Sequence, residues 1–141
     1  MNTISDILRS HSHRLTKPRQ RVFTELEKSS RPLSMGNIVA ACNDVDRVSI
    51  YRTLELFIAL NIINVIPVGW KKRYELAGPF KPHHHHLQCA RCGELVAIDT
   101  PRLEGMIADL AISHGYTLTH HHIELTGLCD RCKNDQQKST R

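Results

Sequence analysis

The order of apolar and polar positions predicts three helices in the first half of the chain. The first begins at Thr16-Lys17-Pro18, since threonine is favoured at an N-cap and proline is tolerated in the first turn. A second, short helix is capped by Ser34, and a third covers residues 48–58. Apolar residues recur at helical spacing in all three. The candidate core positions are Val22, Phe23, Leu26, Ile38, Val39, Ile50, Leu54, Phe57 and Ile58, with Cys42 as a buried apolar residue.

A β-hairpin is predicted directly after the third helix. Residues 62–68 are apolar and β-branched, and residues 71–76 follow a turn at Gly69. Asn61 is suited to the left-handed position that ends a helix. The order helix, helix, helix, ribbon is typical of a winged helix-turn-helix, in which the helix before the ribbon enters the DNA major groove.

Candidate DNA contacts lie on the third helix and around the start of the first. Arginine can donate two hydrogen bonds to guanine, and tyrosine can contact a thymine methyl group or a phosphate. The alternative is that the tyrosine packs in the core and the arginine is only solvated. The candidates for base contacts are Tyr51 and Arg52, and the basic cluster for phosphates consists of Arg14, Lys17, Arg19 and Arg21.

The net charge divides unevenly between the two halves. Residues 1–80 carry 12 Lys and Arg against 7 Asp and Glu, whereas residues 81–141 carry 7 against 7, so the first half holds the whole net charge of +5. This asymmetry favours a polyanion-binding module, and a solvated basic face is the alternative. Two prolines and a glycine between the halves predict a hinge. We therefore expect a DNA-binding domain over 1–78, a hinge over 79–82 and a second domain over 83–141.

Two closely spaced cysteine pairs predict a metal site in the second half. Cys89 and Cys92 form one C-x2-C pair, and Cys129 and Cys132 form another after 36 intervening residues. That gap exceeds the ~15–20 residues usual in a zinc ribbon, so a small subdomain must fold between the pairs. Four thiolates make a closed, structural zinc site. Redox-active dithiols and inert buried pairs are the alternatives.

Two histidine runs accompany the cysteines. Residues 83–86 are four histidines, and along an extended chain alternate members face opposite ways, which pairs 83 with 85 and 84 with 86. A solvated histidine patch is the alternative. The second run belongs to an expected strand over 120–125, on which His121 shares the inward face with Ile123 and Leu125.

A helix is expected between the two histidine runs. Thr100-Pro101 opens it, and the apolar positions that it carries are Leu103, Ile107 and Leu110. Glu104 lies in the first turn, where a carboxylate suits the helix dipole even without a metal.

Together these motifs resemble the ferric uptake regulator family of bacterial metal-sensing repressors. The resemblance covers roughly residues 8–133. It is carried, in order, by residues 15–19, 49–54 and 74–76, the histidine run at 83–86, Cys89-x2-Cys92-Gly93, His114-Gly115 and the second cysteine pair.

The resemblance implies an α+β protein, with an N-terminal winged helix-turn-helix and a small C-terminal α/β dimerisation domain that holds a structural zinc site. Such proteins are homodimers that bind palindromic double-stranded DNA operators as repressors when they carry metal. By position, the structural Zn²⁺ ligands are Cys89, Cys92, Cys129 and Cys132. A second metal site comprises His83, His85, Glu104 and His121, and a sensor site Glu75, His84 and His86. The implied DNA contacts are Arg14, Lys17, Arg19, Ser49, Tyr51 and Arg52.

The chain departs from the family pattern at two sensor positions. Arg31-Pro32 stands where the resemblance implies a histidine before the second helix, and Ala97 stands where it implies an acidic residue. Asp99 faces the same way as Ala97 on a strand and is a candidate substitute. Nitrogen-rich sites accept Zn²⁺ or Fe²⁺ as the regulatory ion, and also Mn²⁺ or Ni²⁺. The peroxide-sensing branch relies on an acid at position 97, so it is a weaker alternative.

Other function classes are weaker. A zinc-dependent hydrolase needs an open metal site with a general base, and the chain has no H-E-x-x-H motif, so we expect no enzyme activity. A metal-buffering or storage protein leaves the basic first half unexplained. The chain has neither an apolar run of about 18 residues nor a signal-peptide pattern at its start, which predicts a cytoplasmic protein with no membrane partner.

Overall fold

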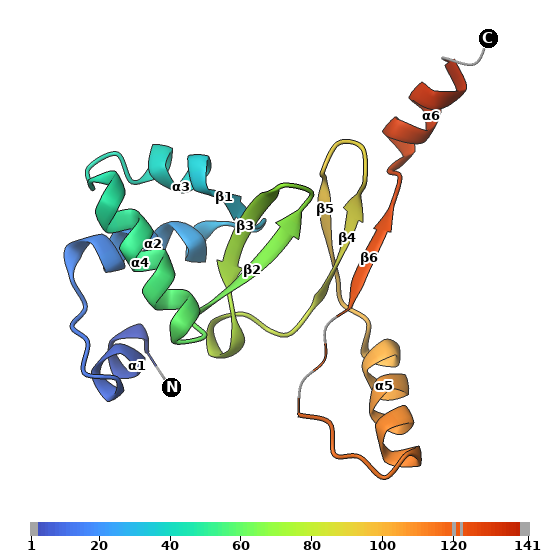
Figure 1. Ribbon diagram of the computed structural model, residues 1–141, viewed down its shortest axis with the longest axis horizontal. Helices are drawn as coiled ribbons and strands as arrows, with labels where there is room; N and C mark the ends of the chain where they lie inside the picture. The colour runs from blue at the N-terminus through green and yellow to red at the C-terminus, as the bar shows by residue number, and fades with distance from the viewer. Residues whose placement is uncertain (1–2, 120, 122, 139–141) are drawn as a thin grey trace. The chain divides into compact units, whose positions relative to one another are not determined.

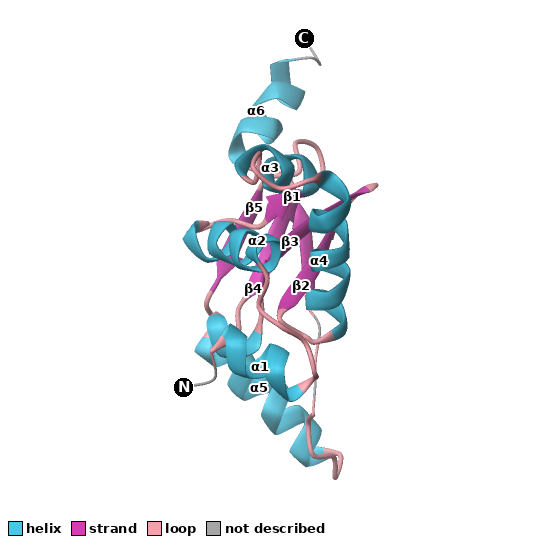
Figure 2. Cartoon of the chain, turned by 90° about the vertical axis from the view of Figure 1, so that its left-hand side faces the viewer, coloured by secondary structure: helices cyan, strands magenta, loops and turns pink. Residues whose placement is uncertain are grey.

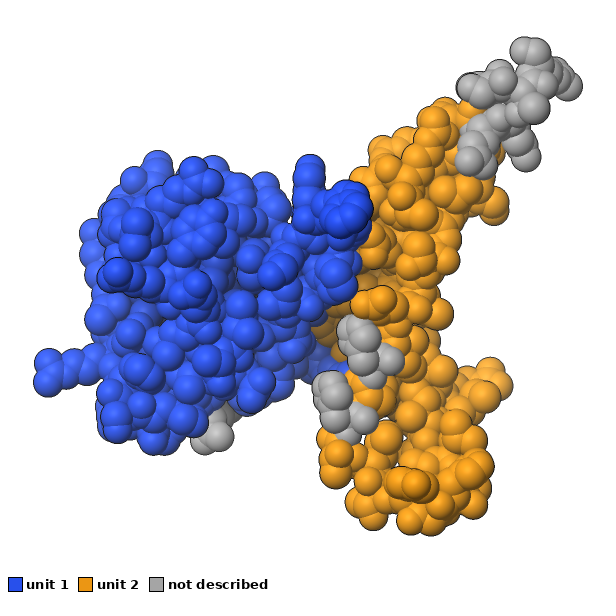
Figure 3. Space-filling view, viewed as in Figure 1, with its two compact units in different colours: residues 1–83 blue, residues 84–141 orange. Residues whose placement is uncertain are grey.

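The computed structural model describes residues 3–119, 121 and 123–138. The chain divides into two compact units, residues 1–83 and residues 84–141 (Figures 1 and 3). No helix among the described residues is long and apolar enough to cross a membrane.

The described part of the first unit contains four α-helices, and side-chain caps define where most of them start. They are α1 (Ile4–Ser10), α2 (Lys17–Lys28), α3 (Met35–Ala41) and α4 (Arg47–Ala59). Thr3 with Asp6, and Ser34 with Asn37, form capping boxes on α1 and α3. Thr16 is the N-cap of α2, as expected, but its side chain makes no capping hydrogen bond.

A three-stranded antiparallel sheet completes the first unit. Its strands are β1 (Leu33–Ser34), β2 (Ile63–Val68) and β3 (Lys71–Leu76), in the order β1-β3-β2. The pairing of Val68 with Lys71 leaves a two-residue turn, in which Gly69 has a φ of 59°. Asn61 has a φ of 52° directly after α4 and its cap residue, which confirms the predicted left-handed position. A 3-10 helix, η1 (Gly78–Phe80), follows β3.

The core of the first unit follows the predicted stripes, with one correction and two additions. Ile58 is 41% exposed, because α4 buries the face formed by positions 50, 53, 54 and 57, and position 58 lies about a quarter-turn away. The sequence pattern did not predict α1, which contributes Ile4 and Leu8, or the short β1. The predicted core residues Val22, Phe23, Leu26, Ile38, Cys42, Ile50, Leu54 and Phe57 are buried, and Val39 is partly buried.

Among its described residues, the second unit contains a three-stranded sheet and two helices. Figure 2 colours the strands magenta and the helices cyan. The elements of this unit are β4 (His85–Cys89), β5 (Leu95–Ile98), α5 (Pro101–Ser113), β6 (Glu124–Gly127) and α6 (Asp130–Lys138). The strand order is β5-β4-β6, and β4 runs antiparallel to β5 but parallel to β6.

Two expectations for this unit need correction. The last strand begins at Glu124, so His121 and Ile123 precede it, and Leu125 is exposed rather than inward-facing. His120 and His122 lie outside the described residues. Leu110 of α5 is 61% exposed, and no residue of α5 is fully buried. A unit of this size cannot form a large core from its own side chains.

Candidate metal centres and DNA-binding surface

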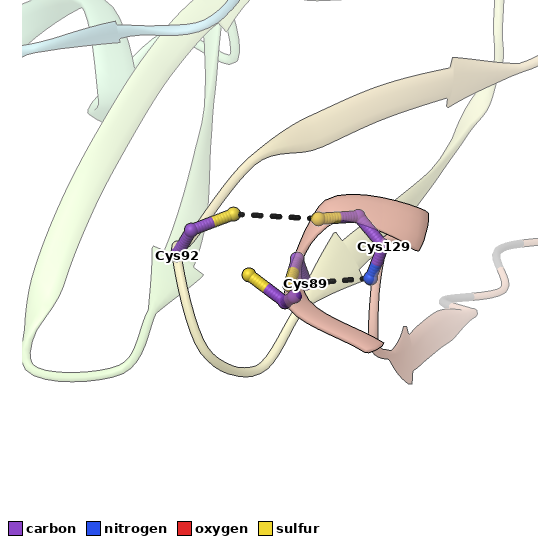
Figure 4. A group of neighbouring side chains, drawn as sticks. Cys89, Cys92 and Cys129 are labelled. Carbon is purple, nitrogen blue, oxygen red and sulfur yellow. Dashed lines mark hydrogen bonds between the residues drawn. The ribbon is translucent and has the colours of Figure 1, made fainter. Parts of the chain in front are cut away.

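Four cysteine sulfurs converge at one end of the second unit. The Sγ atoms of Cys89, Cys92, Cys129 and Cys132 all lie within 4.8 Å of one another. The sulfurs of Cys92 and Cys129 are 3.8 Å apart (Figure 4). Sulfurs held at about 2.3 Å from a tetrahedral zinc ion lie about 3.8 Å from each other. The cluster therefore fits a structural zinc ion with four thiolate ligands.

The strand pairing explains how two distant cysteine pairs meet. The parallel ladder between β4 and β6 places Cys89 opposite Gly127, and the amide of Ala90 donates to the carbonyl of Gly127 at 2.8 Å. Both cysteine pairs therefore lie at the same end of the sheet, where the parallel strands β4 and β6 finish. The described residues between the two cysteine pairs include β5, α5 and β6, which form the subdomain that the long spacing requires.

Each cysteine pair lies in a backbone turn of the same type. The amide of Gly93 donates to the carbonyl of Cys89 at 2.9 Å, and the amide of Lys133 donates to that of Cys129 at 2.9 Å. Gly93 has a φ of 72°, a conformation that glycine adopts without strain. These turns direct both sulfurs of a pair toward one point.

The electrostatics of the cluster also suit a cation. Backbone N–H groups, first that of Cys129, lower the pKa of the Cys89 thiol to about 6. Hydrogen bonding from the Glu94 amide lowers the pKa of Cys92, while burial raises that of Cys132 to about 12. Four thiols this close together cannot all ionise without a compensating positive charge, which a bound zinc ion supplies.

A second cluster lies in the same unit and is built from nitrogen and oxygen. His85 begins β4, Glu104 lies in the first turn of α5, and His121 precedes β6. The Nε2 atom of His85 is 2.5 Å from Oε1 of Glu104 and 3.4 Å from Nε2 of His121. The Nε2 atom of His121 is 3.2 Å from the Glu104 carboxylate.

This arrangement fits a metal ion. Two imidazole nitrogens bound to one tetrahedral zinc at about 2.0–2.1 Å lie about 3.3–3.4 Å apart. The two imidazole nitrogens and the carboxylate oxygen all carry lone pairs, which repel one another unless a proton or a metal cation lies among them. The donor set suits Zn²⁺, Fe²⁺ or Mn²⁺. His83, which the resemblance adds to this cluster, is an exposed residue at the end of the first unit, and its role as a ligand stays a prediction.

The remaining histidines of the run follow the alternation of an extended chain. The rings of His84 and His86 are neighbours, with centroids 4.8 Å apart, while His85 lies with His121. Ala97 on β5 pairs directly with His86 across the ladder. A methyl group therefore takes the cross-strand position at which a carboxylate could reach the His86 ring. Asp99 is exposed just beyond the end of β5.

Glu75 belongs to the first unit, where it is almost fully buried on β3. Lys81 donates a hydrogen bond from Nζ to its Oε2 at 2.9 Å. The sequence does not predict this partner, because a lysine six residues from a glutamate, beyond the end of a strand, has no local signature.

The candidate DNA contacts of the first unit include exposed side chains on α4. Tyr51 is 40% exposed, with the Arg47 guanidinium 5.8 Å from its ring centroid, and Arg52 is exposed. The backbone amide of Ser49 donates to Asp46, which caps the helix, at 2.9 Å. Tyr51 therefore does not pack in the core, contrary to the alternative.

The basic cluster around α2 is smaller than predicted. Arg21 is engaged by Asp44, by Glu25 and by the carbonyl of Ala41, which removes it from the phosphate-binding candidates. Lys17 is 74% exposed and lies 3.4 Å from Asp44. The side chain of Arg19 donates to the carbonyl of Arg14, and Arg14 is exposed.

The sequence and the fold both match known metal regulators. The model of the ferric uptake regulator family matches residues 10–126. The chain is 38% identical over 91 residues to the ferric uptake regulation protein of Campylobacter jejuni, an alignment that covers 64% of this chain and 57% of that protein. It is 28% identical over 143 residues to the ferric uptake regulation protein of Bacillus subtilis, covering 96% of both.

Among solved structures, the ferric uptake regulator of Helicobacter pylori shares the fold. The TM-score is 0.78 at 24% identity, over 89% of this chain and 86% of the other, and that protein is described as having three functional metal binding sites. The chain therefore belongs to the ferric uptake regulator family.

Proposed function

We propose that the chain is a metal-dependent transcriptional repressor of genes for metal uptake or homeostasis, which binds a palindromic double-stranded DNA operator as a homodimer. One observation carries the proposal. A winged helix-turn-helix unit with exposed basic and aromatic side chains on α4 is joined in one chain to a unit with two metal-binding clusters. A metal-buffering protein would need the clusters but not the first unit.

The clusters take different roles in this proposal. The four cysteines hold a structural Zn²⁺, because a site closed by four thiolates leaves no position for exchange. His83, His85, Glu104 and His121 hold a second ion. Glu75, His84 and His86 hold the regulatory ion, either Zn²⁺ or Fe²⁺.

The regulatory ion would act as a switch because its ligands come from both sides of the hinge. Glu75 lies on β3, the last strand of the DNA-binding unit, and His84 and His86 lie at the start of the other unit. An ion that binds all three favours a closed arrangement over an open one, which is the differential affinity that a switch requires. In a dimer, closure would set the spacing of the two α4 helices to about one DNA turn, ~34 Å.

The surface of the second unit supports dimerisation. Exposed apolar side chains from β4, β5, α5 and β6 include Leu87, Val96, Met106, Leu110, Ile112 and Leu125. An exposed apolar surface of this kind is typical of a protein interaction site, and the association of two copies would bury it.

The peroxide-sensing alternative has less support. It needs an acidic side chain beside His86, and the ladder places Ala97 there. A regulatory site that lacks this acidic side chain favours metal sensing over metal-catalysed oxidation.

Selection of DNA from a random duplex library tests the proposal. The full-length, zinc-containing protein is incubated with the library, with and without added Fe(II), Mn(II) or Zn(II). We expect one metal to enrich a palindromic sequence, with an affinity that falls steeply as salt rises. Failure to enrich any sequence with any metal contradicts the proposal and favours metal buffering.

A further inference from the structure

An arginine occupies the same place in both cysteine pairs. Arg91 directly precedes Cys92, and Arg131 directly precedes Cys132. Because the two pairs lie in backbone turns of the same type, the arginines occupy equivalent positions in those turns. A guanidinium group donates hydrogen bonds but offers no lone pair, so neither arginine can be a metal ligand. Their common position indicates a role around the zinc ligands rather than among them.

Arg91 reaches across to the opposite cysteine pair. Its Nη1 atom donates to the carbonyl of Cys132 at 3.1 Å, although the two residues are 41 positions apart in the sequence. Arg91 lies in the turn that follows β4, and Cys132 lies in the first turn of α6. A sulfur ligand keeps its position when the backbone that carries it is fixed. The contact therefore holds the turn with Cys89 and Cys92 against the helix that carries Cys132.

Arg131 makes the return contact, because its guanidinium group lies beside the sulfur of Cys92. The Glu94 amide, and after it Arg131, hold the pKa of the Cys92 thiol below its usual range by hydrogen bonding to the sulfur. The same hydrogen bond and the charge of the Cys92 thiolate raise the pKa of Arg131. Each arginine therefore contacts the cysteine pair to which it does not belong.

The four sulfurs differ in how far solvent can reach them. Cys92 is exposed, whereas Cys89 and Cys132 are buried and Cys129 is intermediate. Cys92 is therefore the sulfur that a dissolved reagent meets first. Four thiolates outweigh the charge of one Zn²⁺ ion by two, and the two guanidinium groups supply that number of positive charges. A thiolate that accepts a hydrogen bond from a cation is less basic and hence less nucleophilic.

We propose that Arg91 and Arg131 form a reciprocal clasp around the structural zinc, in which Arg91 holds the two cysteine pairs together and Arg131 shields the exposed Cys92 thiolate from electrophiles. The inference rests on the assignment of zinc to the four cysteines. It does not depend on DNA binding or on the regulatory ion. Both arginines are positioning residues, and they act in different ways. Loss of Arg91 affects the retention of zinc, and loss of Arg131 affects the reactivity of one sulfur.

The rate of zinc release tests the role of Arg91. Full-length, zinc-loaded protein is mixed with an excess of a chromogenic chelator, and circular dichroism confirms that each variant is folded. Arg91→Ala should release zinc about tenfold faster than the wild type, as expected when a residue that supports a metal ligand is lost. Arg91→Lys, which keeps a charged donor, should restore most of the retention and serves as the test variant if Arg91→Ala does not fold. The matched control is Arg102→Ala, which removes an exposed arginine from the start of α5 and should release zinc at the wild-type rate.

The rate of alkylation tests the role of Arg131. Iodoacetamide transfers its carboxamidomethyl group to a thiolate sulfur and releases iodide, and peptide mass spectrometry measures the rate at each cysteine. Excess Zn²⁺ keeps the site loaded during the reaction. Arg131→Ala should raise the rate at Cys92 roughly threefold, the change expected when the basicity of the thiol rises by about one pKa unit. Arg91→Ala should leave that rate unchanged.

The absorption spectrum of the cobalt-substituted protein provides a readout that a merely structural role would not move. In Arg131→Ala the sulfur-to-cobalt charge-transfer band should shift, because one thiolate has lost a hydrogen bond, while Arg102→Ala should keep the wild-type band. If Arg91→Ala releases zinc at the wild-type rate and Arg131→Ala reacts at Cys92 at the wild-type rate, the clasp is wrong, while the zinc site and the repressor function stand. A wild-type protein that holds no zinc would instead overturn the assignment on which the clasp rests.

Discussion

The ammonium group of Lys81 lies 2.9 Å from Oε2 of Glu75, whose side chain is 5% exposed. The buried carboxylate that we assign to the regulatory metal thus already has a cationic partner from the hinge segment. A metal ion that takes Glu75 as a ligand must compete with this ammonium group. Under the proposed function, we therefore expect Lys81 to raise the metal concentration at which the switch operates.

Replacing Lys81 tests this competition. Lys81→Met should tighten binding of the regulatory metal by roughly five- to tenfold, because the metal ion no longer has to displace an ammonium group from the Glu75 carboxylate. The variant should also lose about 1–2 kcal/mol of unfolding free energy, since a hydrogen bond to a charged group disappears. Metal affinity is measured by competition with a chelator, with Lys28→Met as the control. Unchanged or weaker metal binding in Lys81→Met would show that the two cations do not compete.

The sulfur cluster should be structural. Cys92→Ser should lower the zinc content and unfold the second unit or dissociate the dimer, because zinc binding at ~10–16 kcal/mol exceeds the stability of a typical small domain. Removal of zinc from the wild type by a strong chelator should do the same. Zinc content, sedimentation and circular dichroism provide the measurements.

Cys42→Ala is the matched control, since it removes a cysteine that lies in the core of the first unit. It should retain zinc. A Cys92→Ser protein that stays folded and dimeric without zinc would refute the structural role.

The nitrogen and oxygen cluster should bind its ion independently of the sulfur cluster. Glu104→Gln replaces a carboxylate that lies within 3.2 Å of two imidazole nitrogens, and should weaken metal binding there by about 10- to 100-fold. The zinc of the cysteines should remain. Metal content after dialysis is the readout, and Asp109→Asn on the same helix is the control. Equal metal content in the two variants would mean that Glu104 is not a ligand.

The cap of α4 predicts a pH dependence. Hydrogen bonds from the side chain and the backbone amide of Ser49 hold the pKa of Asp46 below the ordinary value for an aspartate. Because the folded pKa is depressed, this stabilisation is complete above the unfolded pKa and disappears as the pH falls through the folded value. Asp46→Asn, which keeps a capping oxygen, should remove that acid-dependent contribution, and Asp46→Ala should lower the Tm by a few degrees at neutral pH. Thermal unfolding of the variants at pH 3 and pH 7 measures both effects; an Asp46→Ala protein with wild-type stability would show that the cap contributes nothing.

Local signals predicted much of the first unit. Ser34 and Asn61 mark helix ends through their own side chains and conformations, and the apolar stripes that include Val22 and Phe57 lie on single helices. The hydrophobic pattern gave a missing or wrong prediction where the structure depends on residues that are distant in the sequence. The strand β1 exists only because Leu33 pairs with Tyr74, and Ile58 is exposed because the rest of the core selects a narrower face of α4.

The metal centres were predictable only in part. The two-residue spacing between cysteines shows that each pair can bind one ion, but the parallel pairing of β4 with β6 brings the pairs together. Similarly, alternation separates His85 from His84 and His86, yet only the fold brings Glu104 to His85. The contacts of Lys81 with Glu75 and of Arg91 with Cys132 depend on three-dimensional surroundings that spacing does not encode.

The most direct test of metal control is fluorescence anisotropy of the selected duplex as a function of free metal, for the wild type and for His84→Ala with His86→Ala. We expect metal to raise the DNA affinity of the wild type by about 100-fold, which corresponds to about 2.7 kcal/mol of coupling. The double variant should keep its cysteine-bound zinc and bind DNA weakly at every metal concentration. An unchanged metal response in the double variant would contradict the account, because the regulatory ion would then act elsewhere.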